Sequence, residues 1–257
     1  MSLVSSVNQV DGLTPYSKGG RIDPYAIFQL NFQALGGEKN VKNETSFRYK
    51  GEMTLDGNTL QIQEATKRPM QRLRIISSEF RVIYRNGDDG KHTWSFSNGK
   101  LNKYDDSQSP EREVRKLWEE YAYTDPKNRV FNATASRKTT IGGVSCYEVS
   151  IRNTKTDEVV TQYYDAQTFL LKREVKASSF ENIQTDFADY KSVGNTKMAF
   201  RKDILSLNDG SKQSIQWHKI EKGVFISDSI FQAPEEKQTP SDLSSFTGTG
   251  VKVDTFA

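Results

Sequence analysis

The sequence predicts a mainly β protein with helices (α+β), built on one long antiparallel sheet of about 11 strands. Apolar and polar residues alternate with a period of two over many segments. Turn signals recur at intervals of roughly 10–13 residues, as in an antiparallel meander. Aromatic side chains, which suit pleated surfaces, make up 11% of the 257 residues. Because so long a sheet tends to curl, its apolar face is expected to be concave.

The strand pattern continues through nearly the whole chain, so one domain is expected over residues 23–234. Residues 1–22 are polar and contain Ser, Gly and Pro, which predicts a flexible N-terminal segment. Residues 235–257 are rich in Ser, Thr and Gly, which predicts a loosely held polar C-terminal tail.

A first helix is expected to begin at Asp23-Pro24, since Asp is a good N-cap and Pro at the first helical position sacrifices no hydrogen bond. Gly36-Gly37 is expected to end it. Its wide apolar face is formed by Ile27, Phe28, Leu30, Phe32, Ala34 and Leu35.

Strands are expected after this helix. In residues 45–55 the side chains of one parity are Phe47, Tyr49, Gly51, Met53 and Leu55, and the other parity is polar. Asp56-Gly57 and Asn98-Gly99 are tight-turn signals. The segments expected to be strands here are 45–55, 57–67, 70–77, 79–86, 91–97 and 100–104.

A second helix is expected to begin with Ser109 as N-cap and Pro110 as its first residue, and to end before Asp125-Pro126. Its apolar stripe is Val114, Leu117, Trp118 and Tyr121. The strands expected after it are 131–140, 143–152, 158–166, 168–177, 181–191, 196–207 and 211–221.

Composition argues against several classes of function. The net charge of +3 is small and its charges are well mixed, so no nucleic-acid partner is expected. The single cysteine, Cys146, has the parity of polar neighbours and no adjacent histidine, which argues against a nucleophile. His92 and His218 are too few for a zinc site. Asp88-Asp89-Gly90 is interpreted as a hairpin turn, not a calcium loop. No catalytic residue, metal or cofactor is expected, and no run of about 20 apolar residues predicts a membrane span.

Five features, in order, resemble the LolA/LolB-like superfamily of bacterial outer-membrane lipoprotein-sorting proteins. They are ALGGEKNV at the end of the first helix, the KRP triplet Lys67-Arg68-Pro69, the turn Asp89-Gly90-Lys91 leading into Trp94, GGVSCYEVS followed by YYDAQTFLLKRE, and DSIFQAP at residues 228–234. Together they span roughly residues 24–234.

The resemblance implies an unclosed, strongly curved β-barrel with helices forming a lid over an apolar cavity. Carriers of this family hold acyl chains there while crossing the periplasm, and the arginine of their KRP motif, here Arg68, holds the lid. The residues expected to contact ligand or lid are Arg68, Phe47, Tyr49, Met53, Leu60, Ile62, Phe80, Tyr84, Trp94, Phe96, Leu117 and Trp118. Arg68 could also be a solvated arginine before an edge proline.

The expected function is that of a periplasmic carrier for lipoprotein acyl chains or another lipid-like ligand, with no chemistry. An envelope sensor or interaction module with a filled cavity is the alternative, and an enzyme is least favoured. Membrane-protein partners for loading and release, a monomer, and a leader before Val4 are also expected, with outer-membrane anchoring if the chain is lipidated upstream. The set Arg72, Arg74, Arg81 and Arg85 is either a wet sheet face or a rim for an anionic head group or an acidic partner.

Overall fold

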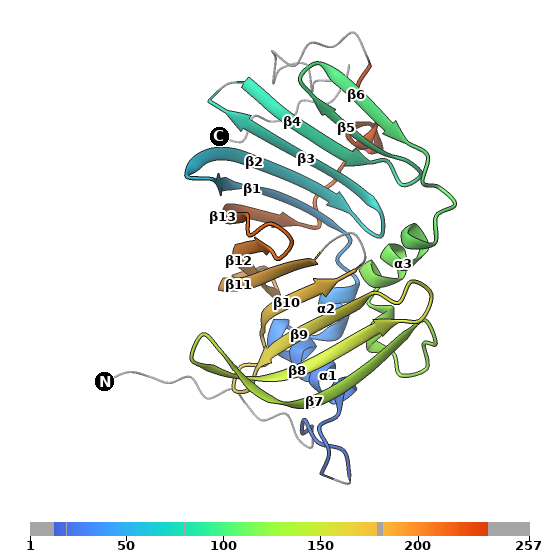
Figure 1. Ribbon diagram of the computed structural model, residues 1–257, viewed down its shortest axis with the longest axis vertical. Helices are drawn as coiled ribbons and strands as arrows, with labels where there is room; N and C mark the ends of the chain where they lie inside the picture. The colour runs from blue at the N-terminus through green and yellow to red at the C-terminus, as the bar shows by residue number, and fades with distance from the viewer. Residues whose placement is uncertain (1–12, 19, 80, 179–181, 236–257) are drawn as a thin grey trace. The chain divides into compact units, whose positions relative to one another are not determined.

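The computed structural model describes residues 13–18, 20–79, 81–178 and 182–235 of the chain (Figure 1). The residues divide into two compact units. The first unit draws on Met1–Lys42, Tyr121–Ala199 and Ile204–Gly210, and the second on Asn43–Glu120, Phe200–Asp203 and Ser211–Ala257. The predicted tail beyond Glu235 and residues 1–12 and 19 of the predicted lead-in lie outside the described residues. Within the lead-in, Tyr16 and Ile22 form an isolated antiparallel bridge.

The described strands form one 13-stranded sheet in the order β6-β5-β4-β3-β2-β1-β13-β12-β11-β10-β9-β8-β7. β6 and β7 end this order, so the sheet is unclosed. The predicted long antiparallel sheet is therefore confirmed, with 13 strands where about 11 were expected. The strands are β1 (Ser46–Leu55), β2 (Asn58–Lys67), β3 (Gln71–Ser78), β4 (Arg81–Asp88), β5 (Thr93–Ser97), β6 (Lys100–Tyr104), β7 (Phe131–Ile141), β8 (Val144–Asn153), β9 (Val159–Asp165), β10 (Leu171–Ala177), β11 (Asn182–Val193), β12 (Thr196–Ser206) and β13 (Lys212–Lys222).

In the first unit, α1 (Pro24–Leu35) contacts β7 and is followed directly by α2 (Glu38–Lys42) (Figure 1). The predicted start is confirmed, because the Asp23 side chain accepts a hydrogen bond from the backbone N–H of Tyr25 at 2.9 Å. Phe28 is buried and meets the rings of Tyr123 and Tyr164 edge-on. The helix is thus held to its unit by aromatic packing.

Gly36 ends α1 with φ of 113°, in the left-handed region that favours glycine. A Cβ added there would lie 2.1 Å from the backbone oxygen of Asn195, in the turn between β11 and β12. Glycine is therefore required at this position both by the helix end and by the close approach of another backbone.

In the second unit, α3 (Pro110–Glu119) begins as predicted, with the Ser109 hydroxyl accepting from the backbone N–H of Arg112 at 3.1 Å. It ends at Glu119, six residues before the predicted stop at Asp125. Tyr121 has φ of 58° and caps the 3-10 turn η1 (Ala122–Thr124), so it does not extend the stripe of α3.

One face of β2 to β6 carries a cluster of buried hydrophobic residues of the second unit. The segment around the 3-10 turn η2 (Asp228–Phe231) packs against this face. Trp94 is central to it, because its indole N–H donates to the backbone carbonyl of Phe231 at 2.7 Å. The buried members of this cluster are Ala65, Leu73, Ile75, Val82, Trp94, Phe96, Ile226 and Phe231.

Candidate functional site

The hairpin between β2 and β3 places the KRP triplet at the edge of a pocket. Lys67 ends β2, and the backbone N–H of Arg68 donates to the carbonyl of Thr45 at 2.7 Å. The Arg68 side chain donates from Nη1 to the carbonyl of Glu44 at 3.3 Å, and its guanidinium lies 5.0 Å from the centre of the Phe47 ring. Arg68 is therefore a half-buried group with several contacts and not a freely solvated arginine.

We call the hollow beside Arg68 the basic pocket. It has a volume of about 260 Å³ and lies within the second unit. Four cationic side chains and two carboxylates line it, so it carries an excess of positive charge. Its lining residues are Phe47, Tyr49, Glu64, Thr66, Arg68, Pro69, Met70, Gln71, Arg72, Arg74, Glu119 and Lys202.

Strand register brings these side chains together on one face. Across β1, β2 and β3 the directly opposed residues are Phe47, Thr66 and Arg72 in one row and Tyr49, Glu64 and Arg74 in the next. Opposed residues in an antiparallel sheet project to the same side. Arg74 donates from Nε to Glu64 at 2.5 Å, which fixes the second row.

Helix α3 meets this hairpin through its last residue. Glu119 Oε1 accepts from Arg72 Nη2 at 3.0 Å, and Glu119 Oε2 lies 3.9 Å from Arg68 Nε. Arg68 thus contacts α3 through the carboxylate of Glu119. The backbone carbonyl that accepts a hydrogen bond from Arg68 Nη1 belongs to Glu44, which lies outside α3.

The first turns of α3 are fixed to the end of β4 by a buried ion-pair cluster. Asp88 accepts from Arg112 Nη2 at 2.6 Å and from Arg115 Nη2, and Arg112 also contacts both carboxylate oxygens of Asp106 at 3.1 and 3.2 Å. Asp88 further accepts from the backbone N–H of Gly90 at 2.8 Å, within the predicted hairpin turn. Asp88 therefore joins the turn to the helix.

The environment acts differently on the two arginines. Burial alone would lower the pKa of Arg112, but its hydrogen bond to Asp88 and the charges of Asp88 and Asp106 raise the pKa above its usual value. Burial lowers the pKa of Arg115, and the nearby positive charges of Arg72 and Arg112 lower it further, while Asp88 opposes them. Burial is thus the main cause of the lowered pKa of Arg115, and the opposing carboxylates offset part of it.

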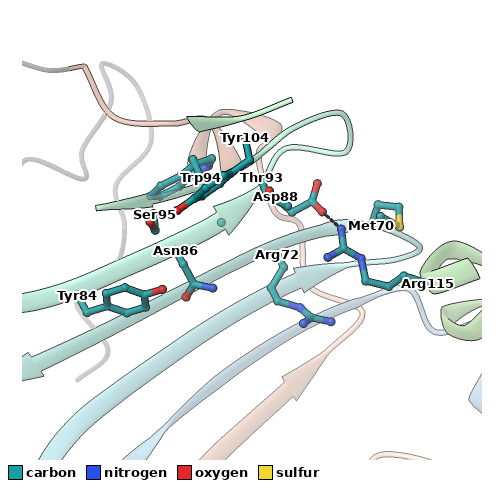
Figure 2. Close-up of a pocket in the computed structure, with 11 residues that line it drawn as sticks. Met70, Arg72, Tyr84, Asn86, Asp88, Thr93, Trp94, Ser95, Tyr104 and Arg115 are labelled. Carbon is teal, nitrogen blue, oxygen red and sulfur yellow. Dashed lines mark hydrogen bonds and ion pairs between the residues drawn. The ribbon is translucent and has the colours of Figure 1, made fainter. Parts of the chain in front are cut away.

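A second hollow, which we call the α3 pocket, has a volume of about 210 Å³ and shares Met70 and Arg72 with the basic pocket. Figure 2 shows Arg115 reaching Asp88, with Arg72 on the neighbouring strand. The lining residues of the α3 pocket are Met70, Arg72, Tyr84, Asn86, Gly87, Asp88, Thr93, Trp94, Ser95, Tyr104 and Arg115.

The structure brings some of the predicted site residues together. Arg68, Phe47 and Tyr49 line the basic pocket, and Tyr84 and Trp94 line the α3 pocket. Further along the same face of β1 and β2 lie Met53, Leu60 and Ile62, of which Met53 and Ile62 are buried. Phe80 lies outside the described residues.

Two predicted cavity aromatics are placed differently from the expectation. Gly87 pairs with Trp94 and Arg85 pairs with Phe96, which puts both rings on the face opposite to Phe47 and Tyr49, in the core beside η2. The Trp94 ring lies so close to Gly87 that a Cβ there would come within 2.5 Å of it, and the ring also reaches the wall of the α3 pocket. Phe96 is a core residue.

Helix α3 carries both a charged and an apolar stripe. Arg112, Arg115 and Glu119 form a charged stripe on α3 whose ion pairs reach β3 and β4, and Val114 of the predicted apolar stripe is buried. Leu117 and Trp118 are half-buried. The charged stripe was visible in the sequence, because residues three and four apart share a helix face, but it was not among the predicted site residues.

The sequence reasoning also missed other members of the two pockets. Arg72 and Arg74 were expected only as a possible rim, whereas Glu64, Lys202 and Glu119 were not expected at all. Arg85, grouped with that rim, is buried on the opposite face, and this burial lowers its pKa.

The remaining reactive groups give no sign of chemistry. Cys146 is fully buried although its parity placed it with polar residues, and burial raises the pKa of its thiol, so the thiolate is disfavoured. The described part of the chain holds no cluster of three or more His, Cys, Asp or Glu that could bind a metal. Nor does it include a helix with the length and apolar character needed to cross a membrane.

No protein-family model matches the sequence. No curated protein matches it either. Many solved structures match this chain in fold, including the following three. A DUF1329 family protein from Desulfovibrio piger has a TM-score of 0.56 and 11% identity, covering 80% of this chain and 96% of that chain. A domain named for outer membrane lipoprotein sorting, from Vibrio parahaemolyticus, has a TM-score of 0.55 and 9% identity over 80% and 95%.

A LolA superfamily protein from Nitrosomonas europaea has a TM-score of 0.51 and 10% identity, covering 79% of this chain and 97% of that chain. At these identities the likeness concerns the fold alone. It agrees with an unclosed antiparallel sheet carrying few helices. The chain therefore has a LolA-like fold.

Proposed function

We propose that the protein is a periplasmic carrier that binds lipoprotein acyl chains, or another acyl-chain ligand, without chemistry. The observation that carries the proposal is the shared fold with the lipoprotein-sorting domain and the LolA superfamily protein over about 80% of this chain. The proposal places the protein in the cell envelope and gives it membrane-protein partners for loading and release.

The proposal has a direct binding test. A fluorescent long-chain fatty acid at micromolar concentration should bind the folded protein saturably, because each buried methylene contributes about 0.8 kcal/mol. A triacylated lipopeptide should displace this probe, whereas a short-chain fatty acid should not. Absence of saturable binding by the folded protein would contradict the carrier.

A second prediction concerns Arg68 as a clasp on α3. Arg68→Leu should bind the same probe about two- to fivefold more tightly, because loss of a partly exposed ion pair to Glu119 removes about 0.5–1 kcal/mol from the closed state. Faster amide hydrogen exchange in α3 should accompany this change.

The matched control is Lys67→Leu, one residue earlier, whose ammonium pairs with Asp228 instead of α3. This variant should leave both the affinity and the exchange of α3 unchanged. A well-folded Arg68→Leu protein with unaltered affinity would remove the clasp from the proposal.

One observation favours the alternative of an interaction module with a filled cavity. Met53, Ile62, Ile215 and Trp217 lie on the same face and are each at most 3% exposed. A face already filled by such side chains would leave little room for an acyl chain. The fatty-acid titration separates the two functions, since a filled face predicts no saturable binding.

A further inference from the structure

The basic pocket and the α3 pocket form one continuous cationic strip, because both are lined by Met70 and Arg72. Five cations belong to it, from the β2–β3 hairpin, α3 and β12: Arg68, Arg72, Arg74, Arg115 and Lys202. The described lining of the two pockets contains three carboxylates: Glu64, Asp88 and Glu119. Subtracting three from five leaves an excess of two positive charges.

Two arginines of the strip, Arg72 and Arg74, have N–H donors beyond those that bond their carboxylate partners. Arg72 and Arg74 each direct one nitrogen to a carboxylate, Glu119 and Glu64 respectively, although a guanidinium offers five N–H donors. Their side chains are 44% and 34% exposed, so the remaining N–H groups are within reach of a ligand. Arg72 and Arg74 are two residues apart on β3 and project to the same side, roughly 7 Å apart along the strand.

The same sheet face changes character along its length. The rows of Phe47 and Tyr49 carry Arg72 and Arg74. In the next row of opposed residues lie Gly51, Ile62 and Ile76, and the row after it contains Met53 and Leu60. One end of the face is thus cationic and the other apolar, as the two ends of an anionic amphiphile require.

We propose that the cationic strip binds the phosphate of an anionic head group whose acyl chain runs toward Ile62 and Met53. Guanidinium groups bind phosphate through paired N–H···O bonds, and a phosphate carries one to two negative charges, which matches the excess of two. The acyl part of this assignment rests on the proposed carrier function. The phosphate part does not.

The test compares oleoyl-glycerol phosphate with oleoyl-glycerol, which has the same chain and no phosphate, and with glycerol phosphate, which has no chain. The wild-type protein should bind the phosphorylated lipid about tenfold more tightly than the neutral one, as expected for charge-assisted hydrogen bonds at a partly exposed site. Added salt should reduce this ratio. In the Arg72→Gln/Arg74→Gln variant the ratio should fall to about one.

The matched control is Arg201→Gln. Arg201 is exposed, has one carboxylate partner, Asp203, and precedes Lys202, so strand alternation points it away from the strip. This variant should retain the wild-type ratio. If the double variant fails to fold, the single Arg72→Gln variant replaces it, and its ratio should fall to about threefold.

The outcomes separate the two proposals. If the wild type binds the two lipids with equal affinity, the phosphate site is overturned and the carrier function is unaffected. The same conclusion follows if the wild type shows the tenfold ratio but the double variant retains it. Binding of glycerol phosphate that is lost in the double variant, with neither lipid bound, supports a site for free phosphate esters and contradicts the carrier.

Discussion

Trp94→Ala is expected to lower the free energy of unfolding of the protein by about 4 kcal/mol. Trp94 is 3% exposed and lies in the core cluster of the second unit, against η2. Truncation would remove most of a large buried side chain, and it would leave the carbonyl of Phe231 without the N–H that now bonds it at 2.7 Å. The midpoint of chemical unfolding, followed by circular dichroism, measures the loss.

Two comparison variants separate the contribution of the buried ring from that of the N–H donor. Trp94→Phe keeps a ring but removes the N–H donor, so it should cost about 1–2 kcal/mol. Tyr104→Ala removes a ring from the adjacent strand at a position that is 52% exposed, and it should change stability by less than about 0.5 kcal/mol. A cost for Trp94→Ala no larger than that for Tyr104→Ala would refute its place in the core.

Asp88→Asn is expected to lower the free energy of unfolding by about 3 kcal/mol, because it breaks a buried ion-pair cluster from one side. The Asp88 side chain is 5% exposed and accepts from both Arg112 and Arg115. Without the negative charge of Asp88, Arg112 and Arg115, whose positive charges repel each other, would remain close together on α3. Faster hydrogen exchange in α3 should accompany the lower unfolding midpoint.

The control for this variant is Asp105→Asn, which removes an exposed carboxylate from the loop before α3. Asp105 accepts a hydrogen bond from the Ser107 hydroxyl at 2.9 Å, and this bond lowers its pKa. Its replacement should leave the midpoint of unfolding nearly unchanged, because the side chain is exposed. If the two aspartate variants were equally stable, Asp88 would not fasten α3 as inferred.

Positions of strands and starts of helices could be predicted because their signals are local. Alternation over residues 45–55 reproduces β1, and Asp23-Pro24 and Ser109-Pro110 mark the two helix starts. The end of α3 was placed too late, since the apolar spacing continued to Tyr121 while the backbone turned there into the left-handed region. Spacing alone does not reveal such a turn.

Alternation within each strand could not predict whether the apolar residues of two different strands lie on the same face of the sheet. Alternation groups Trp94 with Phe96, but only the pairing with Gly87 and Arg85 decides that this pair opposes Phe47. A register shift between Ile76 and Ser77 adds to the difficulty, because a slip of one residue exchanges the two faces. The pocket beside Arg68 is therefore more polar than the apolar site that the sequence predicts around this residue.

The pairing of β1 with β13 has a consequence for synthesis of the chain. Phe47 opposes Lys222 and Leu55 opposes Gln213, so one edge of β1 pairs with a strand that is synthesised much later than β1 itself. Until then that edge offers unpaired backbone groups to any other strand nearby, which exposes the nascent chain to aggregation. Nascent or truncated forms that stop before residue 212 should accordingly need a chaperone to stay in solution.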